Sequence, residues 1–159
     1  MESAQRLFLA AAVLVLAGCA TQTQWMTFPV TRGGKGVPLD VWLKEHPLPS
    51  DQDVSIEEIS RGETSSAALV RIRKTEPPHV HENHDLTAIV LKGLGTLSVG
   101  NRKLELKPGS IVTIPRGVPH SFVNKSPEPA VAYVMFMPAF DGKDMVPVKE
   151  EEPVSAVRK

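Results

Sequence analysis

The chain has 159 residues, with 18 Lys and Arg side chains and 18 Asp and Glu side chains, so its formal net charge is zero. A neutral chain without a basic run interleaved with aromatic residues lacks the field that attracts phosphate backbones, so we expect no nucleic-acid partner. The length suits one domain, and the single cysteine excludes an internal disulfide.

Residues 1–18 have the pattern of an export signal. An apolar run follows Arg6 and covers residues 7–17. It is shorter than the roughly 20 residues that span a bilayer, and it is typical of a signal-peptide core. The run ends in a Leu-Ala-Gly-Cys tetrapeptide whose cysteine is Cys19. A simple secretory signal that contains a cysteine by chance is the alternative.

The tetrapeptide resembles a bacterial lipobox, in which the cysteine receives a diacylglycerol and becomes the new N-terminus. The resemblance implies lipidation of Cys19, a membrane partner through the lipid anchor, and a location in the cell envelope. Several acyl chains make an anchor durable, since each buried methylene contributes about 0.8 kcal/mol. Ala20 after the cysteine is similar to lipoproteins sent to an outer membrane and facing the periplasm, if the source has two membranes.

The next two segments connect this signal to the domain. Residues 19–36 mix Thr, Gln, Gly and Lys without a hydrophobic period, so we expect a flexible tether. Residues 37–53 form an N-terminal extension, in which residues 38–45 predict one or two helical turns, because Pro is favourable at a helix start and His46 precedes a second proline. We interpret His46 as a solvated loop residue.

From residue 54 to 140 the pattern changes to short β-rich runs separated by Gly and Pro turns, with no helix of ordinary length between them. This pattern predicts an all-β sandwich or barrel. Its expected strands cover residues 54–59, 67–73, 86–92, 96–99, 103–106, 111–114, 121–124 and 130–137.

Two features border this predicted barrel. The apolar runs at 86–91 and 131–137 predict strands packed on both faces, which is consistent with a homodimer or with cover from the N-terminal segment. Residues 141–159 are polar and predict a solvated tail.

Four of the five histidines lie in two short segments: His79, His81 and His84 in the first, and His120 in the second. Neutral imidazole is the commonest protein ligand for metals, and two histidines at i and i+2 of a strand project to the same side. A histidine from a neighbouring strand can then close the site. The clustering therefore predicts a metal site.

Both segments resemble the two signature motifs of the cupin superfamily. The resemblance implies a small jelly-roll barrel over roughly residues 54–137. We interpret Arg116 as a solvent-facing turn residue, with contact to an anionic substrate as the alternative. We interpret Asn124 as a hydrogen-bonding residue of its strand. The second motif matches position for position at Gly109, Pro115, Arg116, Gly117, His120 and Asn124.

The first motif departs from the family at one position. His79, His81 and Gly93 fit, but Leu86 stands where the family usually has a Glu ligand. Asp85 is one residue early, so on a regular strand it points to the opposite face and needs a bulge to reach a metal.

The resemblance thus implies a first shell of His79, His81 and His120, with His84 as a fourth ligand or as a residue that supports the ligands. Such a set suits a divalent transition metal, namely Fe, Mn, Ni, Cu or Zn. Three functions stay open: a metal-dependent oxygenase similar to cupin dioxygenases, a module that binds or senses a small molecule, and a metal-free structural barrel.

Overall fold

The computed structural model describes residues 25–27 and 36–148, so the expected lipidation site at Cys19 and the export signal lie outside the described residues. One short helix, α1 (Leu39–Glu45), accompanies twelve strands. No helix in the described part of the chain is long and apolar enough to cross a membrane. The strands are β1 (Trp25–Thr27), β2 (Gly36–Pro38), β3 (Val54–Arg61), β4 (Ser66–Ile72), β5 (Thr75–Val80), β6 (Asp85–Lys92), β7 (Gly95–Val99), β8 (Arg102–Leu106), β9 (Ile111–Ile114), β10 (His120–Asn124), β11 (Ala130–Met137) and β12 (Val146–Pro147).

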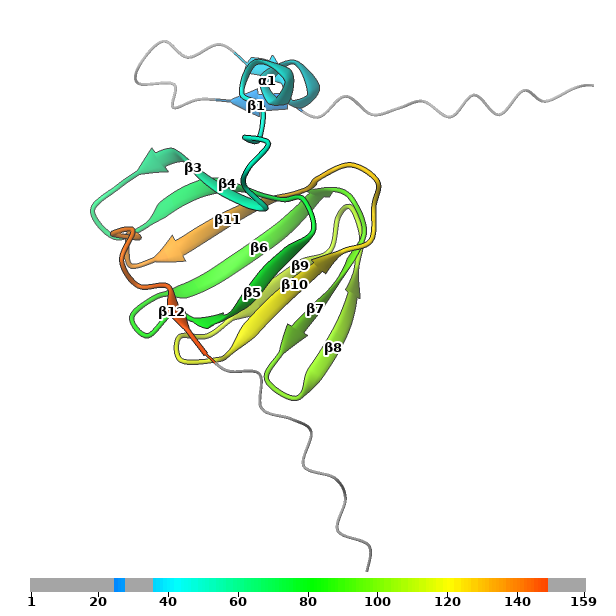
Figure 1. Cartoon of the computed structure of the whole chain (residues 1–159). Helices are drawn as coiled ribbons and strands as arrows, with labels where there is room; N and C mark the ends of the chain where they lie inside the picture. The colour runs from blue at the N-terminus through cyan, green and yellow to red at the C-terminus, as the bar shows by residue number, and fades with distance from the viewer. Residues whose placement is uncertain (1–24, 28–35, 149–159) are drawn as a thin grey trace, which may run out of the picture.

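Ten of these strands form two five-stranded antiparallel sheets (Figure 1). The first sheet has the order β3-β4-β11-β6-β9, and the second has the order β12-β5-β10-β7-β8. The main core contains buried side chains from both sheets, including Val70 and Val134 of the first and Leu97 and Phe122 of the second. The all-β jelly roll expected from the sequence is confirmed.

Strand β4 shows how apolar runs build this fold. Its residues Ala68, Val70 and Ile72 belong to the main core, whereas Leu69 belongs to a second cluster with Leu39 and Trp42 of α1. Because successive residues of a strand point to opposite faces, both faces of β4 are buried. Leu69 is fully buried, and such a side chain contributes about 1.5–3 kcal/mol. Helix α1 therefore covers the outer face of this strand, and Val131 of the expected 131–137 strand belongs to the same cluster.

The eight expected strands are all present, with ends within two residues of the expected positions. The other four strands, β1, β2, β5 and β12, differ from the expectations. Strand β1 lies in the stretch expected to be a tether and pairs with β2. Strand β5 lies outside the strands that the sequence predicts, because Pro77 and Pro78 interrupt its pattern. The expected tail begins with residues 141–148, which the structure places against the barrel through the pairing of β12 with β5.

Candidate metal centre

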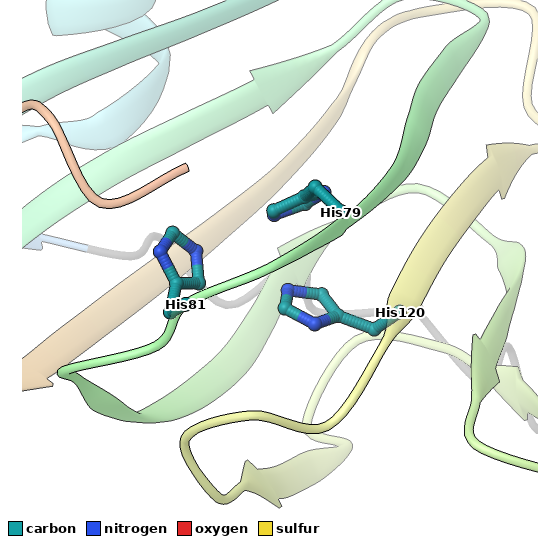
Figure 2. A group of neighbouring side chains, drawn as sticks. All are labelled: His79, His81 and His120. Carbon is teal, nitrogen blue, oxygen red and sulfur yellow. The ribbon is translucent and has the colours of Figure 1, made fainter. Parts of the chain in front are cut away.

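Three histidines meet at one end of the paired strands β5 and β10 (Figure 2). His120 is the cross-strand partner of His79, and His81 follows directly after β5. The three residues are 2–5% exposed, and their ring centroids lie 4.2 to 5.5 Å apart. One ring nitrogen from each histidine lies within 4.8 Å of the others, and no Cys, Asp or Glu of the described chain joins this group.

Hydrogen bonds fix which nitrogen of each ring is free. The Nδ1 atoms of His79, His81 and His120 lie 2.9, 2.9 and 3.0 Å from the carbonyl oxygens of Pro77, Asp144 and Val118. A carbonyl oxygen only accepts hydrogen bonds, so each Nδ1 carries the proton and donates it. Each neutral ring therefore presents the lone pair of Nε2, which is the arrangement that supports metal-binding histidines in proteins.

The environment keeps these rings neutral. Burial lowers the pKa of His79, and burial together with the charge of His79 lowers the pKa of His81. The same two causes lower the pKa of His120 to about 4. Since a metal competes with protons for imidazole, a low pKa leaves the lone pairs available at neutral pH.

The histidines border a cavity of about 80 Å³ between the two sheets. Most of its wall is apolar and includes Leu86, Ile114 and Phe136. Leu86 is 5% exposed, so the residue at the usual Glu position of the family faces this cavity with an alkyl side chain. The chemistry of the donor set therefore depends on imidazole, which fits a divalent transition metal.

Asp85 and Arg116 bind each other away from the histidines. The Asp85 carboxylate accepts hydrogen bonds from the Arg116 backbone N–H at 2.9 Å and from Nη2 at 2.7 Å. These side-chain and backbone hydrogen bonds lower the pKa of Asp85 to about 2. Arg116 is therefore an exposed turn residue with an intramolecular partner, and Asp85 ties the turn before β10 to the start of β6.

The same turn holds the first histidine segment directly. Gly117 has a φ of +75°, a conformation that favours glycine, and its backbone N–H donates to the His81 carbonyl oxygen at 2.7 Å. Farther along β10, the Asn124 side chain bonds the Arg73 carbonyl and the Ser126 backbone N–H, which confirms its structural interpretation.

His84 lies outside the three-histidine group. Its Nδ1 contacts the Asp144 carboxylate, and its Nε2 lies 3.3 Å from the Ala139 carbonyl oxygen. Both ring nitrogens thus face oxygen atoms of the segment that follows β11. A role for His84 as fourth ligand stays a prediction, while its contacts fit the alternative of a supporting residue. His46 is exposed and stacks on Trp42, at the end of α1.

Asp144 is the residue of this region that sequence reasoning missed. It is 6% exposed, and its carboxylate accepts hydrogen bonds from the backbone N–H groups of Glu82 and Asn83 as well as from His84. Its carbonyl oxygen accepts the hydrogen bond from His81. No sequence pattern marks this residue, because it lies in a polar segment 60 residues beyond the loop that it holds.

Replacement of Asp144 by Asn is expected to destabilise the protein in a pH-dependent manner. Burial opposes ionisation, but hydrogen bonds from His84 and Asn83 lower the pKa of Asp144 from 3.8 to about 2. This stabilisation is complete above pH 3.8 and is lost as the pH falls through 2. We expect the variant to lose about 2 kcal/mol of unfolding free energy at pH 7 and little at pH 2, measured by urea unfolding.

The matched control for this experiment is Asp51→Asn, because Asp51 is exposed. It should unfold like the unmodified protein at both pH values. A destabilisation by Asp144→Asn of equal size at pH 7 and pH 2 would show that the effect does not come from the ionised carboxylate.

Comparisons with known proteins agree with this architecture. The family profile described as Cupin domain matches residues 68–136. A protein of Aquifex aeolicus (strain VF5), described as uncharacterized, is 39% identical over 100 residues, which cover 63% of this chain and 82% of the relative.

Two solved structures are similar to this chain in fold. The protein TT1209 from Thermus thermophilus is 26% identical with a TM-score of 0.54, over 62% of this chain and 95% of its own. A Klebsiella pneumoniae protein described as having a double-stranded beta-helix domain is 21% identical with a TM-score of 0.57, over 68% of this chain and 95% of its own. Residues 68–136 of the chain therefore form a cupin domain.

Proposed function

We propose that this cupin holds one divalent transition metal on His79, His81 and His120 and presents it to a small molecule in the barrel cavity. The observation that carries the proposal is the orientation of the three rings, whose Nδ1 protons are bound to carbonyl oxygens so that the Nε2 lone pairs stay free. A metal in a site of this kind supplies a Lewis acid or a redox centre.

The protein residues set the conditions for that chemistry. The carbonyl partners orient the rings before a metal arrives, and the apolar cavity wall excludes most water from the reacting side. Three protein ligands leave at least one coordination position for a small molecule, as in catalytic rather than structural metal sites. Iron, manganese, nickel, copper and zinc are the candidate metals.

A metal-dependent oxygenase is the second candidate function. The apolar cavity beside a three-histidine site favours it, because such a cavity can hold an organic substrate next to open coordination positions. Oxygen consumption by the iron-loaded protein in the presence of a substrate is the measurement that separates an oxygenase from a binding or sensing module.

We also propose that a lipid on Cys19 anchors the protein in the cell envelope. The support is the apolar run that ends in the lipobox-like tetrapeptide before Cys19. Mass spectrometry of the N-terminal peptide from cell membranes tests this, since an unmodified cysteine there would contradict it.

Elemental analysis tests the metal proposal. The full-length protein, purified without a histidine tag, is expected to contain close to one transition metal per chain, and His120→Ala is expected to lose most of it. His46→Ala is the matched control, because His46 is exposed and lies outside the three-histidine group. Equal metal content in the two variants, or no metal after loading with all five candidates, would contradict the proposal.

A further inference from the structure

Glu76 is turned into the barrel by a local irregularity of β5. It lies three residues before His79, so regular alternation would place the two side chains on opposite faces. However, the pairing with β10 shifts: His79 is opposite His120, whereas Glu76 is opposite Phe122. Pro77 and Pro78 therefore share the space opposite one residue of β10, which is a β-bulge and reverses the alternation.

The residues across the strand confirm this orientation. Cross-strand partners project to the same face of a sheet, and Phe122 belongs to the buried core between the sheets. Glu76 lines the same cavity as His79, His81 and His120. At about 3.3 Å per strand residue, the backbone positions of Glu76 and His79 are at most about 10 Å apart.

The surroundings of Glu76 offer its carboxyl group no partner. The three histidines are the other polar side chains that line the cavity, and the rest of its wall is apolar. Burial is the cause that raises the pKa of Glu76 to about 7, and no hydrogen bond or ion pair within the described part of the chain offsets it. The Glu76 side chain is half-buried, and it is the one carboxyl group among the described residues that line the cavity.

The size and the apolar wall of the cavity limit which molecules can bind beside the Glu76 carboxyl group. Its volume of about 80 Å³ is smaller than the roughly 150 Å³ cavity that holds benzene in another protein, so it accepts a few heavy atoms or the reacting end of a larger molecule. The apolar wall disfavours a second anion beside Glu76. A hydroxyl group suits both forms of the acid, because it can donate to a carboxylate and accept from a carboxylic acid.

We propose that Glu76 is a second polar anchor of the cavity and that the site takes a small uncharged molecule whose hydroxyl group binds Glu76. The other end of this molecule reaches the metal held by the three histidines. Only this contact with the metal rests on the proposed function. The ligand class is therefore a short alcohol with a second oxygen, such as a diol or a hydroxyketone. At the Glu76 end of the molecule, the carboxyl group and the apolar wall disfavour a second anionic group.

Binding of defined probes to the full-length, zinc-loaded protein tests this proposal. The probes are 1,2-propanediol and hydroxyacetone, and lactate is the anion of similar size, compared with them in the metal-free protein so that zinc cannot bind its carboxylate. Selective carbon-13 labelling of Glu carboxyl groups allows NMR to follow Glu76, assigned by its absence in Glu76→Gln. We expect either neutral probe to shift the Glu76 resonance and lactate to leave it unchanged.

Variants separate a ligand contact from a packing effect. Glu76→Leu is expected to weaken binding of the neutral probes at least tenfold, whereas Glu76→Gln keeps a hydrogen-bonding group and should lose less. Glu105→Gln is the control, because Glu105 is an exposed carboxylate on β8 that pairs with Lys125. Zinc content must stay unchanged in all three variants, which shows that they fold.

The outcomes for the two proposals are distinguishable. A protein that binds no zinc but shows the Glu76 shift would contradict the metal proposal and support the anchor. Zinc binding with no shift from either neutral probe, or equal affinity in Glu76→Leu, would overturn the role of Glu76. Binding of lactate as tight as that of the neutral probes would overturn the ligand class.

Discussion

Saturating zinc is expected to raise the free energy of unfolding of the full-length protein by about 4 kcal/mol when free zinc is 1,000-fold above its dissociation constant. The physical reason is that His79, His81 and His120 are neutral and already oriented in the folded chain, whereas the unfolded chain does not hold them together. In the double variant His79→Ala/His120→Ala this stabilisation should disappear. Urea unfolding with zinc and with a chelator measures both quantities.

The control in that experiment is His46→Ala, which removes a histidine outside the three-histidine group. This variant should retain the full zinc effect, because His46 is not one of the three histidines. If zinc bound to scattered histidines instead, both types of variant would weaken its binding about equally. A double variant that is stabilised by zinc as much as the unmodified protein would place the metal elsewhere. No stabilisation of the unmodified protein by zinc or by any other candidate metal would favour a metal-free barrel.

Replacement of Leu86 by Glu is expected to have opposite effects in the metal-free and zinc-loaded protein. Leu86 is 5% exposed and borders the cavity together with the three histidines. Without metal, a carboxyl group in this apolar wall should cost about 3 kcal/mol of unfolding free energy. With zinc, the carboxylate adds a charged ligand, and we expect zinc affinity to rise at least tenfold.

Leu86→Gln provides the matched comparison for this prediction. Its side chain has nearly the shape of Glu and should destabilise the metal-free protein, but a neutral amide is a weak ligand for zinc. Calorimetric titration with zinc then isolates the contribution of the carboxylate. Equal zinc affinity in the two variants would show that position 86 does not face the metal.

Much of the fold could be predicted because burial follows local patterns. The alternating and continuous apolar runs marked eight strands, and the resemblance of the histidine segments to the cupin motifs implied the three residues that the structure brings together. In both cases the information lies in short stretches of sequence. Imidazole chemistry and the period of a strand indicated a metal site, and the resemblance to the cupin motifs implied its ligands.

The remaining features depend on pairing between distant segments. Strand β5 was missed because two prolines obscure its pattern, and the bulge at these prolines reverses the direction of Glu76 relative to His79. Asp144 was assigned to a polar tail because its burial arises from contacts with a loop about 60 residues earlier. Neither register shifts nor such long-range hydrogen bonds leave a periodic signal in the sequence.

The tie between Asp144 and the 82–84 loop also sets an order of events during protein synthesis. At about 5–20 residues per second, Asp144 emerges roughly 3–12 s after His84, which lies 60 residues earlier. In the last part of this interval, after His120 has been added, the ribosome-bound chain contains all three histidines of the group but not yet Asp144, which holds the 82–84 loop. A nascent chain that stops before Asp144 therefore carries every ligand while His81 lacks the carbonyl that orients its ring.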